Sequence, residues 1–280
     1  MVEIKDLGFS YGRHNVFNNV NLKLEPGMIY GLLGQNGVGK TTLLKIIAGL
    51  LKVKHGSCSI CCDDKNNLIP YDRKPSFLEN IFYLPEDYAG PDVIIEDYAK
   101  SIGNFYPNFD IAKFYNIAKE LDVNVKSKFT KLSFGQQKKG IISIALSMGT
   151  DILLLDEPSN GLDIPSKTIL RQIIAQNATD NQMIIISTHQ VKDLENLIDP
   201  IIILDKNGVV INETIDSISK KLLFEINPTI DKEALYTENV LNGYINVKEN
   251  TTQIESNVNI EALFNCVITN KEKIKLIFKK

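Results

Sequence analysis

The sequence predicts an α/β protein in which helices cover a largely parallel sheet. Three apolar runs of strand length carry this prediction, at residues 28–33, 152–156 and 184–188. Runs of this kind are typical of strands buried on both faces of a sheet. Polar or glycine-rich residues follow each run, at the carboxyl ends where open α/β sheets place their ligands. We therefore expect a ligand site where these three strands end.

The first run leads directly into a glycine-rich loop. Its sequence is Gly34-Gln35-Asn36-Gly37-Val38-Gly39-Lys40-Thr41-Thr42, which fits G-x-x-x-x-G-K-[ST] between a strand and a helix. The glycines let backbone N–H groups wrap around a phosphate chain. Lys40 adds a positive charge for the β- and γ-phosphates, and the Thr41 hydroxyl suits Mg²⁺. The loop predicts a nucleoside triphosphate site, with a turn that binds nothing as the alternative.

Length and charge limit the other classes of function. A chain of 280 residues with 44% apolar residues accommodates one large domain and a small one. Its net charge is −3 with acids and bases interspersed, so we expect no nucleic-acid partner. The N-terminus shows no signal-peptide pattern, and no window reaches the ~18 apolar residues of a membrane span. We expect a cytoplasmic location.

The cysteines resemble a metal cluster only at first sight. In the predicted strand 55–62, Cys58 and Cys62 lie on one face and Cys61 on the other. A second pair of cysteines or histidines is also missing from the sequence pattern. We therefore expect free thiols, as in a reducing compartment.

The run 151–158 ends in two acids. An acid at such a strand end can hold Mg²⁺, and a second can orient or deprotonate a water molecule. We assign Asp156 to the metal and Glu157 to the role of base. Solvated acids at a surface turn are the alternative for either residue alone.

A further anion site is predicted shortly before this strand. Ser133 is placed to cap the helix that runs through residues 141–146, and helix N-termini attract negative charge. The segments 159–163 and 184–189 then follow in order.

With these motifs in sequence, residues 1–220 resemble the nucleotide-binding subunit of an ATP-binding cassette (ABC) transporter, of the exporter-like branch. The resemblance implies a P-loop NTPase cassette with a mixed sheet, flanking helices and a helical subdomain at about residues 87–146. It implies that Tyr11 stacks on adenine, that the Walker A loop spans Gly34 to Thr42, and that His189 contacts the γ-phosphate. It further implies a Walker B strand at Leu153 to Glu157, a D-loop at Ser159 to Asp163, and a signature at Leu132 to Gln136 whose Ser133, Gly135 and Gln136 reach the nucleotide of a second cassette.

Two residues depart from the family pattern. The signature of the family has two adjacent glycines, and Phe134 replaces the first. Glu86 stands where the family has a glutamine at the metal site, and a carboxylate can still bind Mg²⁺ or water. We expect Thr41, Asp156 and Glu86 to serve the metal, with a plain surface acid as the alternative for Glu86.

The resemblance implies a subunit that binds and hydrolyses ATP with Mg²⁺, using Lys40, Glu157 and His189, as a homodimer of cassettes. It implies an integral-membrane permease as partner, a peripheral location at the inner face of the membrane, and export as the direction. A soluble ABC-type ATPase of DNA repair, translation or cluster assembly is the alternative. The long heptad arms or second cassette of such proteins are missing from this sequence. A nucleotide sensor without hydrolysis is disfavoured by Glu157 and His189.

Two helices at residues 93–99 and 111–118 are predicted for the helical subdomain. Its aromatic residues form either core or a permease-docking surface; they are Tyr88, Tyr98, Phe105, Tyr106 and Phe109.

A final hairpin is predicted around residues 206–211, and a short linker at 217–221. For residues 221–280 we predict a small accessory domain of order β-α-β-β-α-β. The strands are predicted at 222–226, 244–247, 253–258 and 272–278, and the helices at 232–241 and 260–264.

Overall fold

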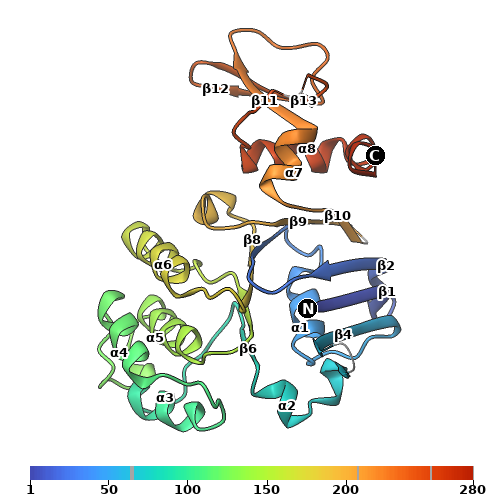
Figure 1. The fold of residues 1–280 in the computed structure, drawn as a ribbon. Coiled ribbons are helices and arrows are strands. Elements are labelled where there is room, and N and C mark those ends of the chain that lie inside the picture. Colours follow the sequence, from blue (N-terminus) through green and yellow to red (C-terminus); the bar gives the residue numbers. More distant parts are fainter. Residues whose placement is uncertain (64–65, 207, 253, 280) are drawn as a thin grey trace.

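The computed structural model describes residues 1–63, 66–206, 208–252 and 254–279. Three sheets and the helices between them build the chain (Figure 1). The central six-stranded sheet has helices on one side and a four-stranded sheet with α1 (Lys40–Ile47) on the other, while the third sheet lies beyond one edge.

The central sheet has the order β10-β9-β3-β8-β7-β6, and only the edge strand β10 is antiparallel. All three apolar runs predicted as strands lie in it as neighbours. The strands are β3 (Ile29–Leu33), β6 (Ile81–Leu84), β7 (Ile152–Asp156), β8 (Met183–Thr188), β9 (Ile201–Asp205) and β10 (Gly208–Glu213). The predicted final hairpin is confirmed by the pairing of β9 with β10, although Asn207 lies outside the described residues.

Alternate side chains of this sheet enter two separate buried clusters. Leu153 and Leu155 pack with the helices on one side, whereas Ile152 and Leu154 pack with α1 and the four-stranded sheet. Both faces are therefore covered, as the continuous apolar runs predict.

The four-stranded sheet has the order β2-β1-β4-β5 and is antiparallel. Its strands are β1 (Val2–Tyr11), β2 (His14–Leu24), β4 (His55–Asp63) and β5 (Asn66–Leu68). Two short helices follow, η1 (Pro70–Asp72) and α2 (Pro75–Leu78). In β4, Cys58 is buried and Cys61 is partly exposed, as the alternation predicts, and the side chain of Cys62 is outside the described part.

The helical region confirms the two helices expected in the helical subdomain. Its helices are α3 (Ile95–Gly103), α4 (Ile111–Glu120), η2 (Phe129–Lys131) and α5 (Phe134–Ser147). Helix α6 (Ile164–Asn177) follows β7, and η3 (Val191–Leu194) follows β8. The aromatic residues of this region are mostly core: Tyr88, Tyr98, Tyr106 and Phe109 pack against the cluster, whereas Phe105 is 76% exposed.

The C-terminal region corrects the predicted order of elements. It contains α7 (Ile215–Lys221), β11 (Leu222–Asn227), β12 (Tyr236–Val240), β13 (Gly243–Glu249), α8 (Ile260–Thr269) and α9 (Lys271–Lys279). The predicted strands at 222–226 and 244–247 and the helix at 260–264 are confirmed. The predicted helix at 232–241 is wrong because residues 236–240 pair with β13 in a hairpin.

Three further expectations for this region are wrong. Residues 217–221 belong to α7, which Thr214 caps by accepting from the Ser217 N–H, and are not a linker. Residues 254–258 form no strand, and Gln253 lies outside the described residues. Residues 271–279 are helical, because Ile274 and Ile277, one turn apart, are the side chains that become buried. The observed order is β-β-β-α-α after α7.

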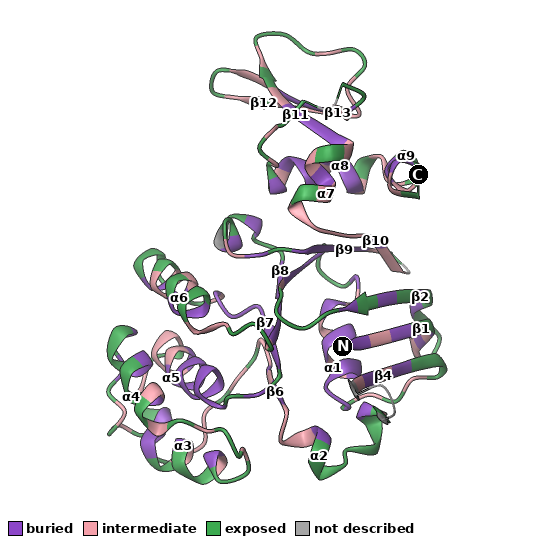
Figure 2. Ribbon diagram, in the orientation of Figure 1, coloured by how far each residue is buried: buried purple, intermediate pink, exposed green. Residues whose placement is uncertain are grey.

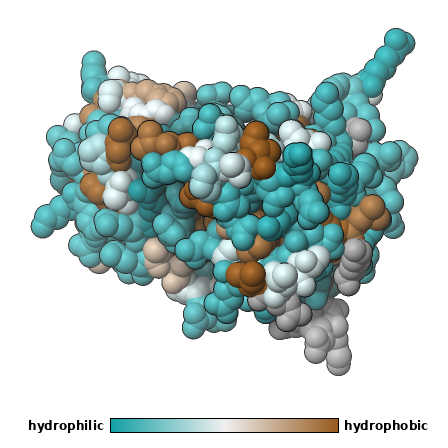
Figure 3. All heavy atoms as spheres, turned by 90° about the horizontal axis from the view of Figure 1, so that it is seen from above, coloured by the Kyte–Doolittle hydropathy of each residue, from teal (hydrophilic) through white to brown (hydrophobic). Residues whose placement is uncertain are grey.

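The C-terminal region from α7 to α9 shares a buried cluster with the rest of the chain. Helix α8 lies between the three-stranded sheet β11-β13-β12 and the central sheet, and α9 lies against β10 (Figure 2). Lys271 of α9 forms an ion pair of 2.9 Å with Asp205 of β9. The outer surface seen from this end is mainly hydrophilic with scattered apolar residues (Figure 3). In the part of the chain that the structure describes, no helix has the length and apolar character needed to span a membrane.

Candidate functional site

The glycine-rich loop connects β3 to α1 in the predicted way. Gly39 has φ +111, and a Cβ atom on it would lie 2.8 Å from both Phe17 Cζ and Val16 Cγ1. Only glycine fits there, because the backbone conformation and the close approach of β2 both exclude a side chain. The N–H groups at the start of α1 therefore border the space beside β2, ready for an anion.

Lys40 lies under this loop, with 7% of its surface exposed. Its Nζ donates to the carbonyl oxygens of Gly34 at 2.7 Å and Gln35 at 3.4 Å. Burial lowers the pKa of Lys40, and the nearby carboxylates of Glu157 and Asp156 oppose that shift. Because the Glu157 Oε1 atom is 3.7 Å away, the ammonium group and this carboxylate border the same space.

Glu157 follows β7 in a left-handed backbone conformation, with φ +46. Its N–H donates to the Ser187 backbone and hydroxyl oxygens, both at 3.1 Å, which ties the end of β7 to β8. The Glu157 Oε1 atom lies 2.8 Å from His189 Nδ1, so Glu157 and His189 form a pair. The other carboxylate oxygen, Oε2, is buried and has no hydrogen-bond partner among the described residues. An unpaired buried carboxylate oxygen of this kind favours a ligand, water or a cation beside it.

Asp156 is 1% exposed and lies behind Glu157. The Ser187 hydroxyl donates to its Oδ1, and the Tyr83 hydroxyl donates to its Oδ2 at 3.2 Å. Burial, followed by the charge of Asp156, raises the pKa of Tyr83, so this hydroxyl stays a donor. Asp156 is thus held rigidly at the end of β7.

The donor set fits Mg²⁺. Thr41, Glu86 and the unpaired oxygen of Glu157 are oxygen donors around one space, and Mg²⁺ is commonly held by one or two carboxylates together with substrate phosphates. Asp156 is not among the described residues that line this space, because its two carboxylate oxygens accept hydrogen bonds from Ser187 and Tyr83. Among the described residues no cluster of three or more histidine, cysteine or acidic side chains forms a complete metal cage. The cysteines of β4 therefore belong to no such cluster in the described part.

These groups line one cavity of about 400 Å³. The residues predicted from sequence that line it are Tyr11, Asn36, Gly37, Gly39, Lys40, Thr41, Thr42, Glu86, Glu157 and His189. Gly34, Gln35 and Val38 belong to the loop but are not among the described residues that line the cavity; Gly34 and Val38 are buried, and Gln35 is exposed. Sequence reasoning missed His14 and Val16, which also line the cavity. His14 pairs with Tyr11 across the β1–β2 turn, and the short Gly12-Arg13 turn between two strand-like segments was the signal for this pairing.

Glu86 connects the cavity to two other elements. Its Oε1 accepts from Asn160 Nδ2 at 2.8 Å, and its backbone oxygen accepts from Lys138 Nζ at 2.7 Å. Lys138 is 1% exposed in α5, and burial lowers its pKa. Neither Asn160 nor Lys138 was singled out from the sequence, because their role depends on how α5 packs.

The N-terminus of α5 stands apart from this cavity. Ser133 caps the helix by accepting from the Gln136 N–H at 3.4 Å, as predicted. The described residues lining the cavity include none of Ser133, Gly135 and Gln136. The Phe134 ring instead packs on Gly161, where an added Cβ would lie 2.6 Å from Phe134 Cε1. Within one chain, the N-terminus of α5 therefore lies outside the cavity beside the glycine-rich loop, as far as the structure describes it.

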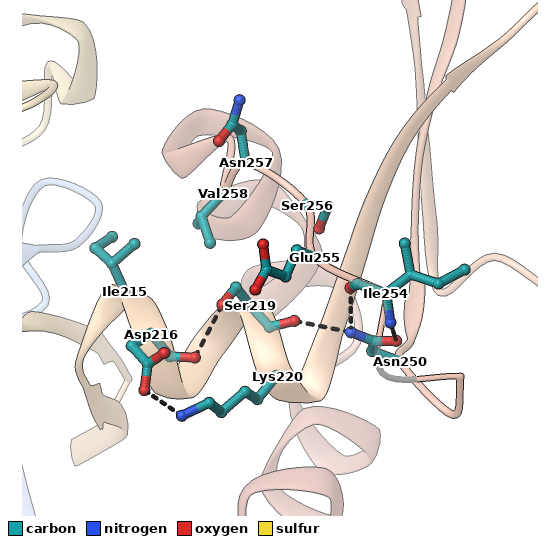
Figure 4. Close-up of a pocket in the computed structure, with 10 residues that line it drawn as sticks. All are labelled: Ile215, Asp216, Ser219, Lys220, Asn250, Ile254, Glu255, Ser256, Asn257 and Val258. Carbon is teal, nitrogen blue, oxygen red and sulfur yellow. Dashed lines mark hydrogen bonds and ion pairs between the residues drawn. The ribbon is translucent and has the colours of Figure 1, made fainter.

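A hollow of larger volume lacks this chemistry. A space of about 780 Å³ lies between α7, Asn250 and residues 254–258 (Figure 4). Its polar groups bind one another: Lys220 pairs with Asp216 at 2.6 Å, and Asn250 Nδ2 donates to the carbonyl oxygens of Ser219 and Ile254, both at 2.9 Å. The smaller cavity, which combines Lys40, paired carboxylates and a helix N-terminus, is the better candidate.

Comparison with known proteins shows which family this chain resembles. The family model described as ABC transporter matches residues 17–160. An uncharacterised ABC transporter ATP-binding protein of Methanocaldococcus jannaschii is 30% identical over 247 residues, covering 86% of this chain and 89% of that protein. The energy-coupling factor transporter ATP-binding protein EcfA2 of Staphylococcus aureus is 31% identical over 237 residues, covering 80% and 78%.

Solved structures show the same fold. An ATP-binding subunit of an ABC transporter has 25% identity and a TM-score of 0.69, covering 78% of this chain and 91% of that one. A dimeric ABC transporter cassette has 22% identity and a TM-score of 0.66, covering 76% and 98%.

Proposed function

The chain belongs to the ABC transporter family as an ATP-binding ATPase subunit, and from that premise we propose that its cavity hydrolyses ATP between two copies of the chain. The observation that carries this proposal is the pair formed by Glu157 and His189 at 2.8 Å beside the Lys40 ammonium. A base, its polar partner and a phosphate-binding cation border one space, which is what in-line attack by water requires.

We assign the following roles. Tyr11 is 48% exposed beside the loop and offers a ring face for adenine. Lys40 and the N–H groups of the loop bind the phosphates. Glu157 takes the proton of the attacking water, and His189 orients the Glu157 carboxylate and the water. When bound, Mg²⁺ would neutralise developing charge on the phosphate oxygens, and Thr41, Asp156 and Glu86 are the residues proposed to hold it.

Two copies are proposed because one chain leaves the site half built. Ser133 and Phe134 are exposed, and the α5 N-terminus contributes no described residue to its own cavity. Two-fold pairing would bring Ser133, Gly135 and Gln136 of one copy to the γ-phosphate bound by the other. The dimeric cassette with the same fold supports this arrangement.

A permease partner is supported by a groove of about 580 Å³ between α1, β6 and the end of α3. Leu50 and Phe105 line it, and they are 47% and 76% exposed. Exposed apolar side chains around a groove favour a protein partner. We propose a membrane permease in it, with the cassette at the cytoplasmic face and export as the direction of transport.

Glu157→Gln tests the catalytic proposal. The amide keeps the shape of the side chain but cannot accept a proton, so turnover should fall by at least 100-fold while ATP binding persists. On size-exclusion chromatography with ATP, the variant should elute as a dimer. Glu120→Gln changes an exposed acid at the end of α4 and should match the wild type. A Glu157→Gln chain that turns over ATP normally, or stays monomeric with bound ATP, would contradict the proposal.

Phe105→Asp tests the permease groove. A charge at this exposed position should abolish co-purification of a multispanning membrane protein from detergent extracts of the host, because the groove loses its apolar character. Ile230→Asp, at a 58% exposed position of the C-terminal region, is the matched control. Equal recovery of the membrane protein with both variants, or recovery of only soluble partners, would contradict this assignment.

A further inference from the structure

The C-terminal domain lies directly against the segment that carries His189. Helix α8 packs on η3, which begins two residues after His189. In the ion pair between them, Lys192 Nζ lies 3.0 Å from Glu261 Oε2. Val191 and Leu194 of η3 are 8% and 3% exposed, and they belong to the same buried cluster as Leu263 of α8. The contact thus combines a charge pair at the rim with apolar burial inside.

The opposite side of the same segment is bound to α6. Lys167 Nζ donates to Gln190 Oε1 at 3.1 Å, and Arg171 Nη1 donates to the Lys192 carbonyl oxygen at 3.3 Å. The Nε2 atom of Gln190 also lies 3.4 Å from the Nε2 atom of His189. The segment therefore lies between one helix of the cassette and one helix of the accessory domain.

We propose that α8 of the C-terminal domain positions His189 against Glu157, so that this domain sets the turnover rate of the ATPase. The reason is geometric. His189 contacts the Glu157 carboxylate directly and is followed in the chain by residues 190–194. These residues are held in place by α6 and α8 together. Loosening α8 would leave the segment held on one side only, and a displacement of about 1 Å at a catalytic group can lower a rate 100-fold. The inference rests on the role proposed above for His189.

A charge reversal tests the contact on the surface of the molecule, where folding is not at risk. Glu261→Lys and Lys192→Glu each place like charges opposite one another, and each should lower kcat by about threefold, the size expected for an exposed pair. KM for ATP and the affinity for a fluorescent ATP analogue should stay at wild-type values, because neither residue lines the cavity. The double exchange restores opposite charges and should therefore recover part of the lost rate. Recovery should be incomplete, because Glu195 and Glu238 would repel a glutamate at position 192. Glu272→Lys, on the exposed part of α9, is the control and should change nothing.

Leu263→Ala tests the apolar part of the same contact. It should lower kcat by about tenfold. Hydrogen exchange at residues 189–194 should accelerate as well. Leu223→Ala removes an equally buried side chain of the accessory sheet from β11 and should lower the unfolding temperature with no loss of kcat.

The outcomes separate the two proposals. A wild-type chain without ATPase activity would overturn the proposed function itself. An active wild type whose Glu261→Lys and Leu263→Ala variants keep full kcat would overturn only the role of the C-terminal domain. A loss of rate in the single variants that the double exchange does not restore even in part would overturn it as well.

Discussion

At the scale of single residues, the end of β7 shows how a small number of contacts prepares a reaction. Asp156 has both carboxylate oxygens occupied, by Ser187 and Tyr83, whereas Glu157 has one oxygen on His189 and one with no hydrogen-bond partner in the described part of the chain. Adjacent acids thus have different surroundings, one held in place and one left available. This difference is the physical basis for giving them different roles.

The first prediction concerns Lys40. Lys40→Ala should weaken binding of a fluorescent ATP analogue on the order of 10- to 100-fold, since the loss is that of a charge-assisted hydrogen bond to phosphate. A titration of the purified variant measures this loss. Lys45→Ala removes a lysine from the last turn of the same helix and should bind as the wild type does. Equal affinities for the two variants would contradict the phosphate-binding role.

The second prediction concerns Tyr83, whose ring lines the proposed permease groove while its hydroxyl binds Asp156. Tyr83→Phe removes that hydrogen bond alone, so Asp156 is held less well and more Mg²⁺ should be needed for half-maximal ATPase activity. Equilibrium binding of Mg²⁺ with a nucleotide analogue should weaken in parallel. Tyr106→Phe is the control, because its hydroxyl lies in the same groove but donates to the Ile81 carbonyl oxygen. If both variants respond alike to Mg²⁺, the contact with Asp156 has no such role.

At the scale of elements, the two 14-residue helices α5 and α6 begin at N-termini that are capped by side chains. Ser133 caps α5, and Asp163 caps α6 by accepting from the Ser166 N–H at 3.1 Å. The first cap lies in the segment 132–136 and the second at the end of the segment 159–163. Each therefore fixes where a functional loop stops and a rigid helix begins.

The third prediction follows from the Asp163 cap. Hydrogen bonds from Ser166, first its hydroxyl and then its N–H, lower the pKa of Asp163 below its ordinary value of 3.8. A carboxyl with a lowered folded-state pKa adds stability above its unfolded-state pKa and loses it as the pH falls through the folded-state value. Asp163→Asn caps without titrating, so its unfolding temperature should lie below that of the wild type at pH 6 and approach it near pH 3. Asp97→Asn, at an exposed position in α3, is the control. A wild-type advantage that stays constant across this range would rule the mechanism out.

At the scale of the whole molecule, the cassette and the accessory domain share one buried cluster. Ile203 of β9 and Ile218 of α7 belong to the same cluster as Val247 of β13 and Leu263 of α8. Continuous packing of this kind predicts cooperative unfolding, because opening one part exposes the apolar surface of the other.

The fourth prediction tests this cooperativity. Saturating ATP bound to the Glu157→Gln variant should slow hydrogen exchange in β13 as well as in β7, because ligand binding raises the free energy of global unfolding by about 2.7 kcal/mol at a concentration 100 times Kd. Exchange followed by mass spectrometry measures both strands. If β7 gains protection while β13 does not, the two parts unfold independently.

Much of the site was predictable from local sequence. The glycine-rich loop, the acids after β7 and the serine cap of α5 each depend on neighbours within a few residues, and they were identified from them. Tyr83, Ser187, Asn160 and Lys138 were not identified, since each acts on a partner at least 31 positions away. Their side chains carry no pattern of their own, and only packing gives them a role.

The C-terminal domain shows the same limit at the level of elements. Alternation of Ile274, Leu276 and Phe278 predicts a strand, but Ile274 and Ile277 are the buried pair and Leu276 is 63% exposed. Residues 232–235 favour a helix, yet the Asn242-Gly243 turn lets 236–240 pair with β13. By itself the sequence determined the cassette fold and most residues of its cavity, because a phosphate loop and strands buried on both faces leave local patterns. The tertiary structure alone decided the form of the C-terminal domain and its contact with the segment after His189, because those depend on which surface each element meets.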